Sequence, residues 1–405
     1  MSTVSAQARV SFRAMFPDAV RLGSDVLLAS NRLRGARVGI VCNHASVDAQ
    51  FRHVVDRLTA ADGVRLAAIF GPQHGFRSDV QDNMVETPHG EDAARSVPVY
   101  SLYSETREPT ADMLRNVDLL VIDLPDIGAR IYTYIYTMAN CLRAAARHRI
   151  PVVVCDRPNP IGGVQVEGAL LAAGFESFVG QFPIPMRHGM TIGELAALFN
   201  EEFGIGAQVE IARMERWERG QYGDQAGLPW VMPSPNMPTI DTAVVYPGTV
   251  LFEGTLLSEG RGTTRPFELV GMPGVDAERF AAAMNRLELP GVFFRPAVFE
   301  PTFQKHAQRT CGGCQIHVLD RDAFRPVMTG VALIQLFRHA HPSGFAWRQP
   351  PYEYERDKMP IDILAGSGVL RKQVESDISP MEIAAGWSDD ERAFGTIRQK
   401  FLLYP

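Results

Sequence analysis

Continuous apolar runs, each followed by polar residues, constrain the fold of this chain more than any other feature. Such runs cover residues 37–42, 64–70, 97–103, 117–124 and 151–155. They are apolar at successive rather than alternate positions, which is typical of parallel strands buried on both faces. Helix-like segments at residues 47–60, 110–116 and 132–148 separate several of the runs. The alternation predicts an α/β fold with a Rossmann-like, doubly wound, mostly parallel sheet.

Polar residues stand at the end of every predicted strand. In chain order they are Asn43 and His44; Gln73, His74 and Arg77; Ser104 and Glu105; Asp123, Asp126 and Arg130; and Asp156, Arg157 and Asn159. In an open parallel sheet, ligands bind beyond the carboxyl ends of the strands. We therefore expect these residues to form one continuous site along one edge of the sheet.

The rest of the chain predicts a second, smaller domain. Residues 229–238 contain four prolines, so they can be neither helix nor central strand. We take them as the connection between a domain over residues 1–240 and an α+β domain over residues 241–405. A helix is expected to begin at Thr191, which can form a capping box with Glu194. Helices at residues 277–287 and 327–339 and a strand at residues 315–319 are expected in the second domain.

Composition and missing motifs exclude several classes of function. The net charge is −6 and there is no basic tract, which argues against nucleic acid as a partner. Neither Gly-x-Gly-x-x-Gly nor a phosphate loop follows the first strand, so no nucleotide cofactor is expected. Neither His-x-His nor His-Glu-x-x-His occurs, so no metal is expected. A serine hydrolase is disfavoured because there is no Gly-x-Ser-x-Gly.

The cellular location is predicted from the lack of membrane and signal segments and from the cysteines. No apolar run has transmembrane length, and residues 1–20 lack the pattern of a secretory signal. Five cysteines, an odd number, fit a reducing compartment. Cys311-Gly-Gly-Cys314 is interpreted as two thiols at a turn. We expect a cytoplasmic protein, or a periplasmic one if the chain has been processed.

Residues 251–268 are the densest candidate for a site. They hold three Glu, two Arg, three Thr and three Gly. A solvated loop with salt bridges is the plainer interpretation, but glycines let backbone approach a ligand and Arg forks bind carboxylates. Paired carboxylates are what glycoside hydrolysis requires. Six arginines near candidate positions would suit an acidic substrate, although structural ion pairs are the alternative for each: Arg77, Arg130, Arg157, Arg187, Arg261 and Arg265.

Several long motifs together resemble the NamZ/YbbC-type exo-β-N-acetylmuramidase family of bacterial cell-wall glycosidases. The resemblance runs from about Arg37 to Tyr404. It rests on residues 117–138, Asp156-Arg-Pro-Asn-Pro-Ile-Gly-Gly163, Arg187-His-Gly-Met-Thr-Ile-Gly-Glu194, Pro233-Ser-Pro-Asn-Met-Pro-Thr239 and residues 253–268. It implies an active-site cleft between the two domains. It also implies release of N-acetylmuramic acid, which bears a lactyl carboxylate, from muropeptide-derived oligosaccharides, with no cofactor.

One position departs from the family pattern. The family's usual Pro-Glu-His-Gly loop is Pro72-Gln73-His74-Gly75 here, and an amide cannot act as a catalytic acid. Either another carboxylate acts, or the substrate differs, or the chain is a catalytically silent sugar-binding or regulatory protein. The catalytic candidates are Gln73, His74, Asp126, Glu253 and Glu259. The substrate-binding candidates are Asn43, Arg77, Arg130, Tyr134, Asp156, Arg157, Asn159, His188, Asn236, Arg261, Thr263 and Arg265.

Overall fold

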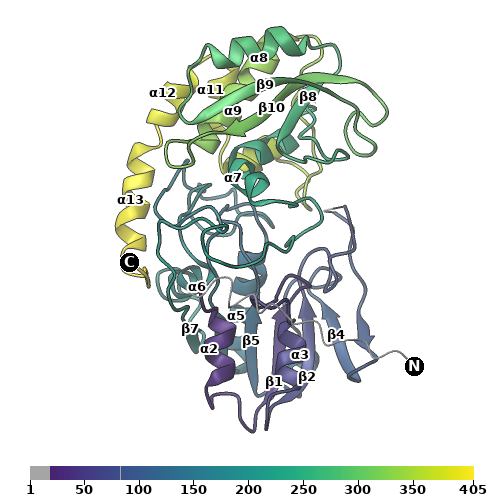
Figure 1. Ribbon diagram of the computed structural model, residues 1–405, viewed down its shortest axis with the longest axis vertical. Helices are drawn as coiled ribbons and strands as arrows, with labels where there is room; N and C mark the ends of the chain where they lie inside the picture. Colours follow the sequence, from purple (N-terminus) through teal and green to yellow (C-terminus); the bar gives the residue numbers. More distant parts are fainter. Residues whose placement is uncertain (1–18, 83) are drawn as a thin grey trace, which may run out of the picture.

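A computed structural model describes residues 19–82 and 84–405. The signal-sequence prediction for residues 1–20 therefore falls almost wholly outside the described residues. Figure 1 shows a large sheet in the N-terminal half, a layer of loops above it, and a smaller sheet with helices in the C-terminal half. The predicted α/β fold with a smaller C-terminal α+β part is confirmed.

The larger sheet has seven strands in the order β3-β4-β2-β1-β5-β6-β7. All neighbours pair in parallel except β3 and β4. The strands are β1 (Arg37–Cys42), β2 (Arg65–Gly71), β3 (Gly90–Asp92), β4 (Val97–Ser101), β5 (Leu119–Asp123), β6 (Val152–Cys155) and β7 (Val209–Ala212). The five apolar runs are the five central strands of this sheet.

Both faces of the sheet are buried, which explains the continuous apolar runs. On β5, Leu120 and Ile122 enter one core and Leu119 and Val121 enter the other, because successive side chains point to opposite faces. The sheet is accompanied by α2 (Gly23–Ala29), α3 (Val54–Thr59), α4 (Ala111–Leu114), α5 (Tyr134–His148) and α6 (Ile192–Glu201).

The helix predicted over residues 47–60 is wrong in its first half. Asp48 instead holds a turn, since its carboxylate accepts hydrogen bonds from the backbone N–H groups of Gln50 and Arg52, both at 2.9 Å. Such side-chain bonds to nearby backbone compete with a helix, and α3 begins only at Val54. The Thr191–Glu194 capping box is confirmed, with bonds of 3.0 and 3.2 Å.

The smaller sheet is antiparallel, in the order β8-β10-β9. It comprises β8 (Leu269–Met272), β9 (Val292–Phe299) and β10 (Cys311–Val318). Cys311-Gly-Gly-Cys314 lies in β10, which corrects the predicted turn. A Cβ on Gly312 would come within 1.9 Å of the Val275 carbonyl oxygen, so close backbone packing requires glycine.

Helices complete the C-terminal half. They are α7 (Ile240–Thr249), the 3-10 helix η1 (Val250–Gly254), α8 (Ala277–Asn285), α9 (Pro326–Ala340), α10 (Pro360–Ala365), α11 (Val369–Glu375), α12 (Pro380–Ala385) and α13 (Ser388–Arg398). In Figure 1, α13 runs down one side of the molecule to α6. The last residues of the chain thus pack against the N-terminal half.

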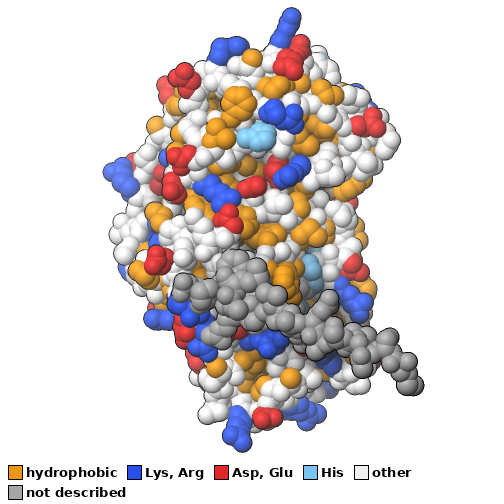
Figure 2. Space-filling model, viewed as in Figure 1, with side chains coloured by type: hydrophobic (Ala, Val, Ile, Leu, Met, Phe, Trp, Pro, Cys, Tyr) orange, Lys and Arg blue, Asp and Glu red, His pale blue; other side chains and the backbone are white. Residues whose placement is uncertain are grey.

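The described residues contain no helix that is long and apolar enough to cross a membrane. On the face in Figure 2, basic and acidic side chains are interspersed outside the grey region.

Candidate active site

A cavity lies where the carboxyl ends of β2 and β5 meet the C-terminal half. We call it the central cavity. The N-terminal half supplies Gln73, His74, Tyr134 and Asn236 to its wall, and the C-terminal half supplies Glu253, Arg261, Tyr352 and Glu353. Ser234, Asn236 and Met237 of the predicted connection line it, so that segment forms part of the site rather than only a link.

Glu253 is a buried carboxylate that is held in its charged form. It lies on η1, and η1 packs so closely on α10 that a Cβ at Gly254 would meet the backbone of Ile361 at 2.6 Å. One carboxylate oxygen accepts a bond from Arg261 at 2.6 Å and the other accepts from the Tyr352 hydroxyl at 2.7 Å. Burial opposes ionisation, but Arg261 and Tyr352 outweigh it and lower the pKa of Glu253.

Glu353 is a second buried carboxyl in the same wall, and its environment has the opposite effect. Burial, and next the negative charge of Glu253, raise its pKa to about 8. The hydroxyl of Tyr103 lies 3.4 Å from its Oε2 and donates to it. At neutral pH the cavity therefore holds one ionised and one protonated carboxyl group. Such a pair can divide the roles of charge stabiliser and proton donor.

Glu353 is not among the site residues that the sequence predicted. The residue lies in a tight turn whose ends, Tyr352 and Glu355, exchange two backbone hydrogen bonds of 2.9 Å. Both central residues are left-handed, with φ 44° at Glu353 and 69° at Tyr354. Glycine or asparagine usually marks such a turn, and neither is present here. The available signal was a run of alternating aromatic and acidic residues after two prolines.

Gln73 and His74 enter the cavity from the loop after β2. The Gln73 Oε1 accepts a hydrogen bond of 2.7 Å from the Thr133 hydroxyl. The His74 Nδ1 donates to the carbonyl of Val80 at 2.8 Å, which leaves its Nε2 as an acceptor. Burial lowers the pKa of His74 to about 4, so the ring is neutral at pH 7.

Polar residues beside and behind these groups fix the cavity wall. The Tyr134 hydroxyl donates to the carbonyl of Pro233 at 2.8 Å. Asn43 lies behind it and donates to the same carbonyl at 2.8 Å. Asn236, in the wall itself, accepts from the Gln81 side chain at 3.0 Å. These bonds tie the 233–237 segment to the loops after β1 and β2.

Four residues predicted in the 251–268 stretch separate into different roles. Arg261 lines the central cavity, and Glu259 lies behind it, 3.4 Å from its Nε and 2.7 Å from the Lys305 ammonium. Thr263 closes a local turn on the carbonyl of Gly260. Arg265 pairs with Glu268 at 3.0 Å, and its side chain is 46% exposed.

Asp126 and Arg157 line a different cavity, which is bounded by the loops after β1, β5 and β6. Asp126 accepts from the Gly128 N–H at 2.8 Å and lies 3.3 Å from the His188 ring. Arg157 holds Asp123 with two bonds, of 2.5 and 3.0 Å. The strand ends thus open into separate cavities, whereas the sequence predicted one continuous site.

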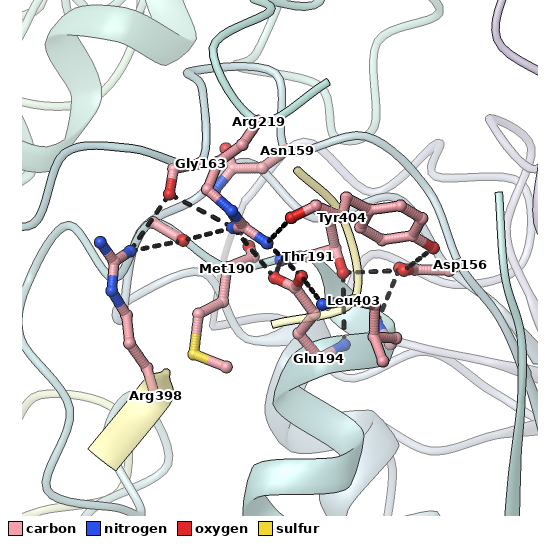
Figure 3. Close-up of polar contacts among 12 residues, drawn as sticks. Asp156, Asn159, Gly163, Met190, Thr191, Glu194, Arg219, Arg398, Leu403 and Tyr404 are labelled. Carbon is pink, nitrogen blue, oxygen red and sulfur yellow. Dashed lines mark hydrogen bonds and ion pairs between the residues drawn. The ribbon is translucent and has the colours of Figure 1, made fainter. Parts of the chain in front are cut away.

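Asp156 and Asn159 belong to the buried network of Figure 3, which ties the chain end to the sheet. Asp156 accepts from the Tyr404 hydroxyl at 2.6 Å, the Thr191 hydroxyl at 2.8 Å and the Gly193 N–H at 2.8 Å. Burial raises its pKa to about 6. Asn159 donates to the carbonyl of Met190 at 3.0 Å. Asp156 and Asn159 therefore bond to other parts of the chain and do not line the central cavity.

The predicted excess of substrate-binding arginines is largely structural. All six lie within the described residues, and Arg261 is the one in the central cavity wall. Arg130 is fully buried and donates to the carbonyls of Ala169, Ile184 and Leu364. Arg187 bonds Gln165 and the carbonyl of Ile161. Arg77 is exposed at the surface.

Across residues 19–82 and 84–405, no group of three or more His, Cys, Asp or Glu could hold a metal ion. The central cavity therefore offers carboxyl groups, an imidazole, phenols and one guanidinium.

Comparison with known proteins decides the family. Residues 38–241 match the N-terminal and residues 244–404 the C-terminal family model of exo-β-N-acetylmuramidase NamZ. This chain belongs to the NamZ family. It is 44% identical over 387 residues to the peptidoglycan β-N-acetylmuramidase NamZ of Bacillus subtilis (strain 168), covering 95% of this chain and 91% of that protein.

Two solved structures of DUF1343 family proteins from Bacteroides fragilis NCTC 9343 share the fold. The first is 33% identical with a TM-score of 0.87 and covers 96% of this chain and 99% of its own. The second is 27% identical with a TM-score of 0.74 and covers 95% and 99%. The similarity spans both halves of the chain.

Proposed function

We propose that this chain is an exo-acting glycoside hydrolase that releases N-acetylmuramic acid from the non-reducing ends of peptidoglycan fragments. The observation that carries the proposal is the pair of buried carboxyl groups, Glu253 and Glu353, in one cavity with their pKa values shifted apart. Membership of the NamZ family and the similarity to the Bacillus subtilis muramidase supply the substrate class.

The residues of the central cavity suit this chemistry. Glycoside hydrolysis passes through a transition state with positive charge at the anomeric carbon. The ionised Glu253, fixed by Arg261 and Tyr352, can stabilise that charge. Neutral His74 and the amide of Gln73 offer hydrogen bonds to sugar hydroxyl or acetamido groups without adding charge. The charge of Arg261 is shared with Glu253 and Glu259, but a guanidinium has five N–H donors, so it can also donate to the lactyl carboxylate.

Both halves of the chain contribute to the site. Loops of the N-terminal half line the cavity together with η1 and the turn at Tyr352 and Glu353 of the C-terminal half. We place the activity in the cytoplasm, because all five cysteines are free and buried, as a reducing compartment would leave them. Cell fractionation tests this location.

The test of the function is turnover of a chromogenic β-N-acetylmuramide beside the matching β-N-acetylglucosaminide. The wild type is expected to hydrolyse the muramide, and Glu253→Gln is expected to lose that activity. Glu278→Gln, the same change on the exposed face of α8, serves as the control. Binding of N-acetylmuramic acid without turnover would instead support a silent binding protein, and turnover of the glucosaminide alone would reject the muramic-acid assignment.

A further inference from the structure

A second hollow, the outer groove, adjoins the central cavity. Its walls include Ser104, Arg107, Phe178, Glu353 and Tyr354. Glu353 lines both hollows, so this one side chain stands at the boundary between them. Tyr354, its neighbour in the same turn, is 54% exposed and faces the groove.

We propose that Glu353 is the proton donor to the glycosidic oxygen and that the outer groove binds the sugar that leaves. This inference rests on the proposed function. A glycosidic oxygen joins the terminal sugar to the next one, so the acid that protonates it must lie between the two sugar sites. Glu353 occupies that position between the central cavity, where we place the terminal sugar, and the more open outer groove, where we place the rest of the chain.

The backbone supports a functional role for this turn. Glu353 and Tyr354 both hold left-handed φ angles, which residues with a side chain adopt only at a cost in free energy. Backbone in sparsely populated regions is concentrated at active sites, where the surrounding structure holds it in place. Here Tyr352 anchors the turn through its bond to Glu253 at 2.7 Å, which fixes the two carboxyl groups relative to each other.

The outer groove is lined by aromatic and acidic residues. The Arg107 guanidinium lies 4.3 Å from the ring centre of Tyr103 and 4.8 Å from that of Tyr354, which holds Tyr354 in place. The charge of Arg107 is already paired with Glu86 at 3.1 Å. Glu105 and Glu355 also line the groove. A sugar that stacks on Tyr354 is therefore expected to be neutral, such as N-acetylglucosamine, and a second acidic sugar would be repelled.

The proton transfer balances within the hydrolysis. The Glu353 carboxyl gives its proton to the glycosidic oxygen, and the electrons of the breaking bond to the anomeric carbon stay on that oxygen. The leaving sugar departs as an alcohol through the groove. Water then supplies the new oxygen at the anomeric carbon, and its released proton returns to the Glu353 carboxylate.

The decisive experiment compares two substrates that share N-acetylmuramic acid and differ in leaving group. One is the 2,4-dinitrophenyl β-glycoside, whose phenolate leaves without a proton, and the other is the β-linked disaccharide with N-acetylglucosamine. Glu353→Gln should lower kcat/KM for the disaccharide by about 10²–10⁴-fold and leave that for the dinitrophenyl glycoside unchanged. Tyr354→Ala should raise KM for the disaccharide alone. Glu278→Gln should change neither substrate.

Equal loss on both substrates, or no loss on either, would overturn the acid assignment. Failure of the wild type on both would instead reject the proposed function, so the two failures are distinguishable.

A pH profile of the wild type tests the same proposal without a variant. Glu353 must be protonated, so kcat/KM for the disaccharide should fall as pH rises through about 8, whereas that for the dinitrophenyl glycoside should not. The groups that face Glu353 are Tyr103, Arg107, Tyr246, Glu253, Arg261 and Tyr352. Burial raises the pKa of the three tyrosine hydroxyls, and the pKa of Glu253 is lowered. None of these groups therefore titrates near 8. Parallel profiles for the two substrates would contradict the proposal.

Discussion

At the scale of single residues, the site depends on two carboxyl groups in one cavity that differ in their partners. Glu253 has a guanidinium and a phenol on its two oxygens, whereas Glu353 feels burial and the charge of Glu253. An isolated buried carboxyl would become neutral, and an isolated ion pair would offer no acid. Because the two lie close together, the site holds one ionised and one protonated carboxyl group at neutral pH.

Arg261 and Arg265 are the same residue type in different surroundings, so the same substitution at each gives a matched pair of variants. Arg261→Lys replaces a fork that bonds Glu253 in the cavity wall by a point charge. Its affinity for N-acetylmuramic acid should fall by about 1–3 kcal/mol, the range for hydrogen bonds to charged groups. Arg265→Lys, at a partly exposed pair with Glu268, should bind as the wild type does. Calorimetry measures both, and equal affinity of Arg261→Lys and wild type would remove Arg261 from the binding site.

Gln73→Glu tests whether this chain lacks a catalytic acid because Gln73 stands where the family's usual loop has a glutamate. The Gln73 side chain lies in the same cavity as Glu253 and Glu353. A third carboxylate would add negative charge, raise the pKa of Glu353 further and stand beside His74. We therefore expect muramidase activity that is unchanged or lower, measured as kcat/KM on the β-N-acetylmuramide. A gain of about 10²-fold or more, the size of general acid catalysis, would show that position 73 is the missing acid.

The sequence could reveal only those site residues that stand in a distinctive local stretch. Glu253 and Arg261 stood out because glycines and charges crowd the 251–268 stretch. Glu353 has no such signal, since its raised pKa comes from burial and from Glu253, one hundred positions earlier in the chain. Arg130 was a misleading candidate because three distant carbonyl groups satisfy it, and sequence patterns do not show such partners.

At the scale of elements, the apolar runs predicted the five central strands because burial on both faces leaves a continuous pattern. Short elements were harder. β7 has only four residues and is partly exposed, and α7 contains Pro247 and β-branched residues that disguise a helix capped by Thr239. The helix predicted over residues 47–60 was half wrong because the Asp48 turn competes with it. Hydrogen-bond competition of this kind is decided by three-dimensional context.

The contact between Tyr404 at the chain end and Asp156 after β6 predicts a pH-dependent loss of stability. Tyr404→Phe removes the donor to buried Asp156 and should lower the free energy of unfolding by about 1–3 kcal/mol. The pKa of Asp156 is already raised from its ordinary 3.8 to about 6, and the tyrosine bond restrains that rise. Without the Tyr404 bond, the pKa of Asp156 in the folded state rises further. The free energy of unfolding then falls as pH rises through that pKa. The deficit should therefore be larger at pH 8 than at pH 5.

Urea unfolding of Tyr404→Phe and wild type at both pH values measures this difference. Tyr354→Phe, whose hydroxyl lies 3.5 Å from Glu86 at the surface, is the control and should change stability little. A deficit that is the same at both pH values would show that Asp156 does not respond to the Tyr404 hydroxyl.

At the scale of the whole molecule, neither half alone contains the site. The sheet supplies Gln73 and His74, and the C-terminal half supplies Glu253, Arg261 and Glu353. The chain end then returns to the N-terminal half, where Leu403 donates to Glu194 at 2.7 Å and Arg398 donates to the carbonyl of Gly189 at 2.7 Å. Figure 3 shows these contacts converging on one network. The two halves are thereby held around the central cavity.

Exo-acting release of N-acetylmuramic acid is best tested by analysis of the reaction products. The protein is incubated with a defined peptidoglycan tetrasaccharide that has N-acetylmuramic acid at its non-reducing end, and with one that ends in N-acetylglucosamine. Mass spectrometry of early time points should find free N-acetylmuramic acid and a trisaccharide from the first substrate and no products from the second. Glu253→Gln should give neither product. Disaccharide products from internal cleavage, or release of N-acetylglucosamine from the second substrate, would contradict the account.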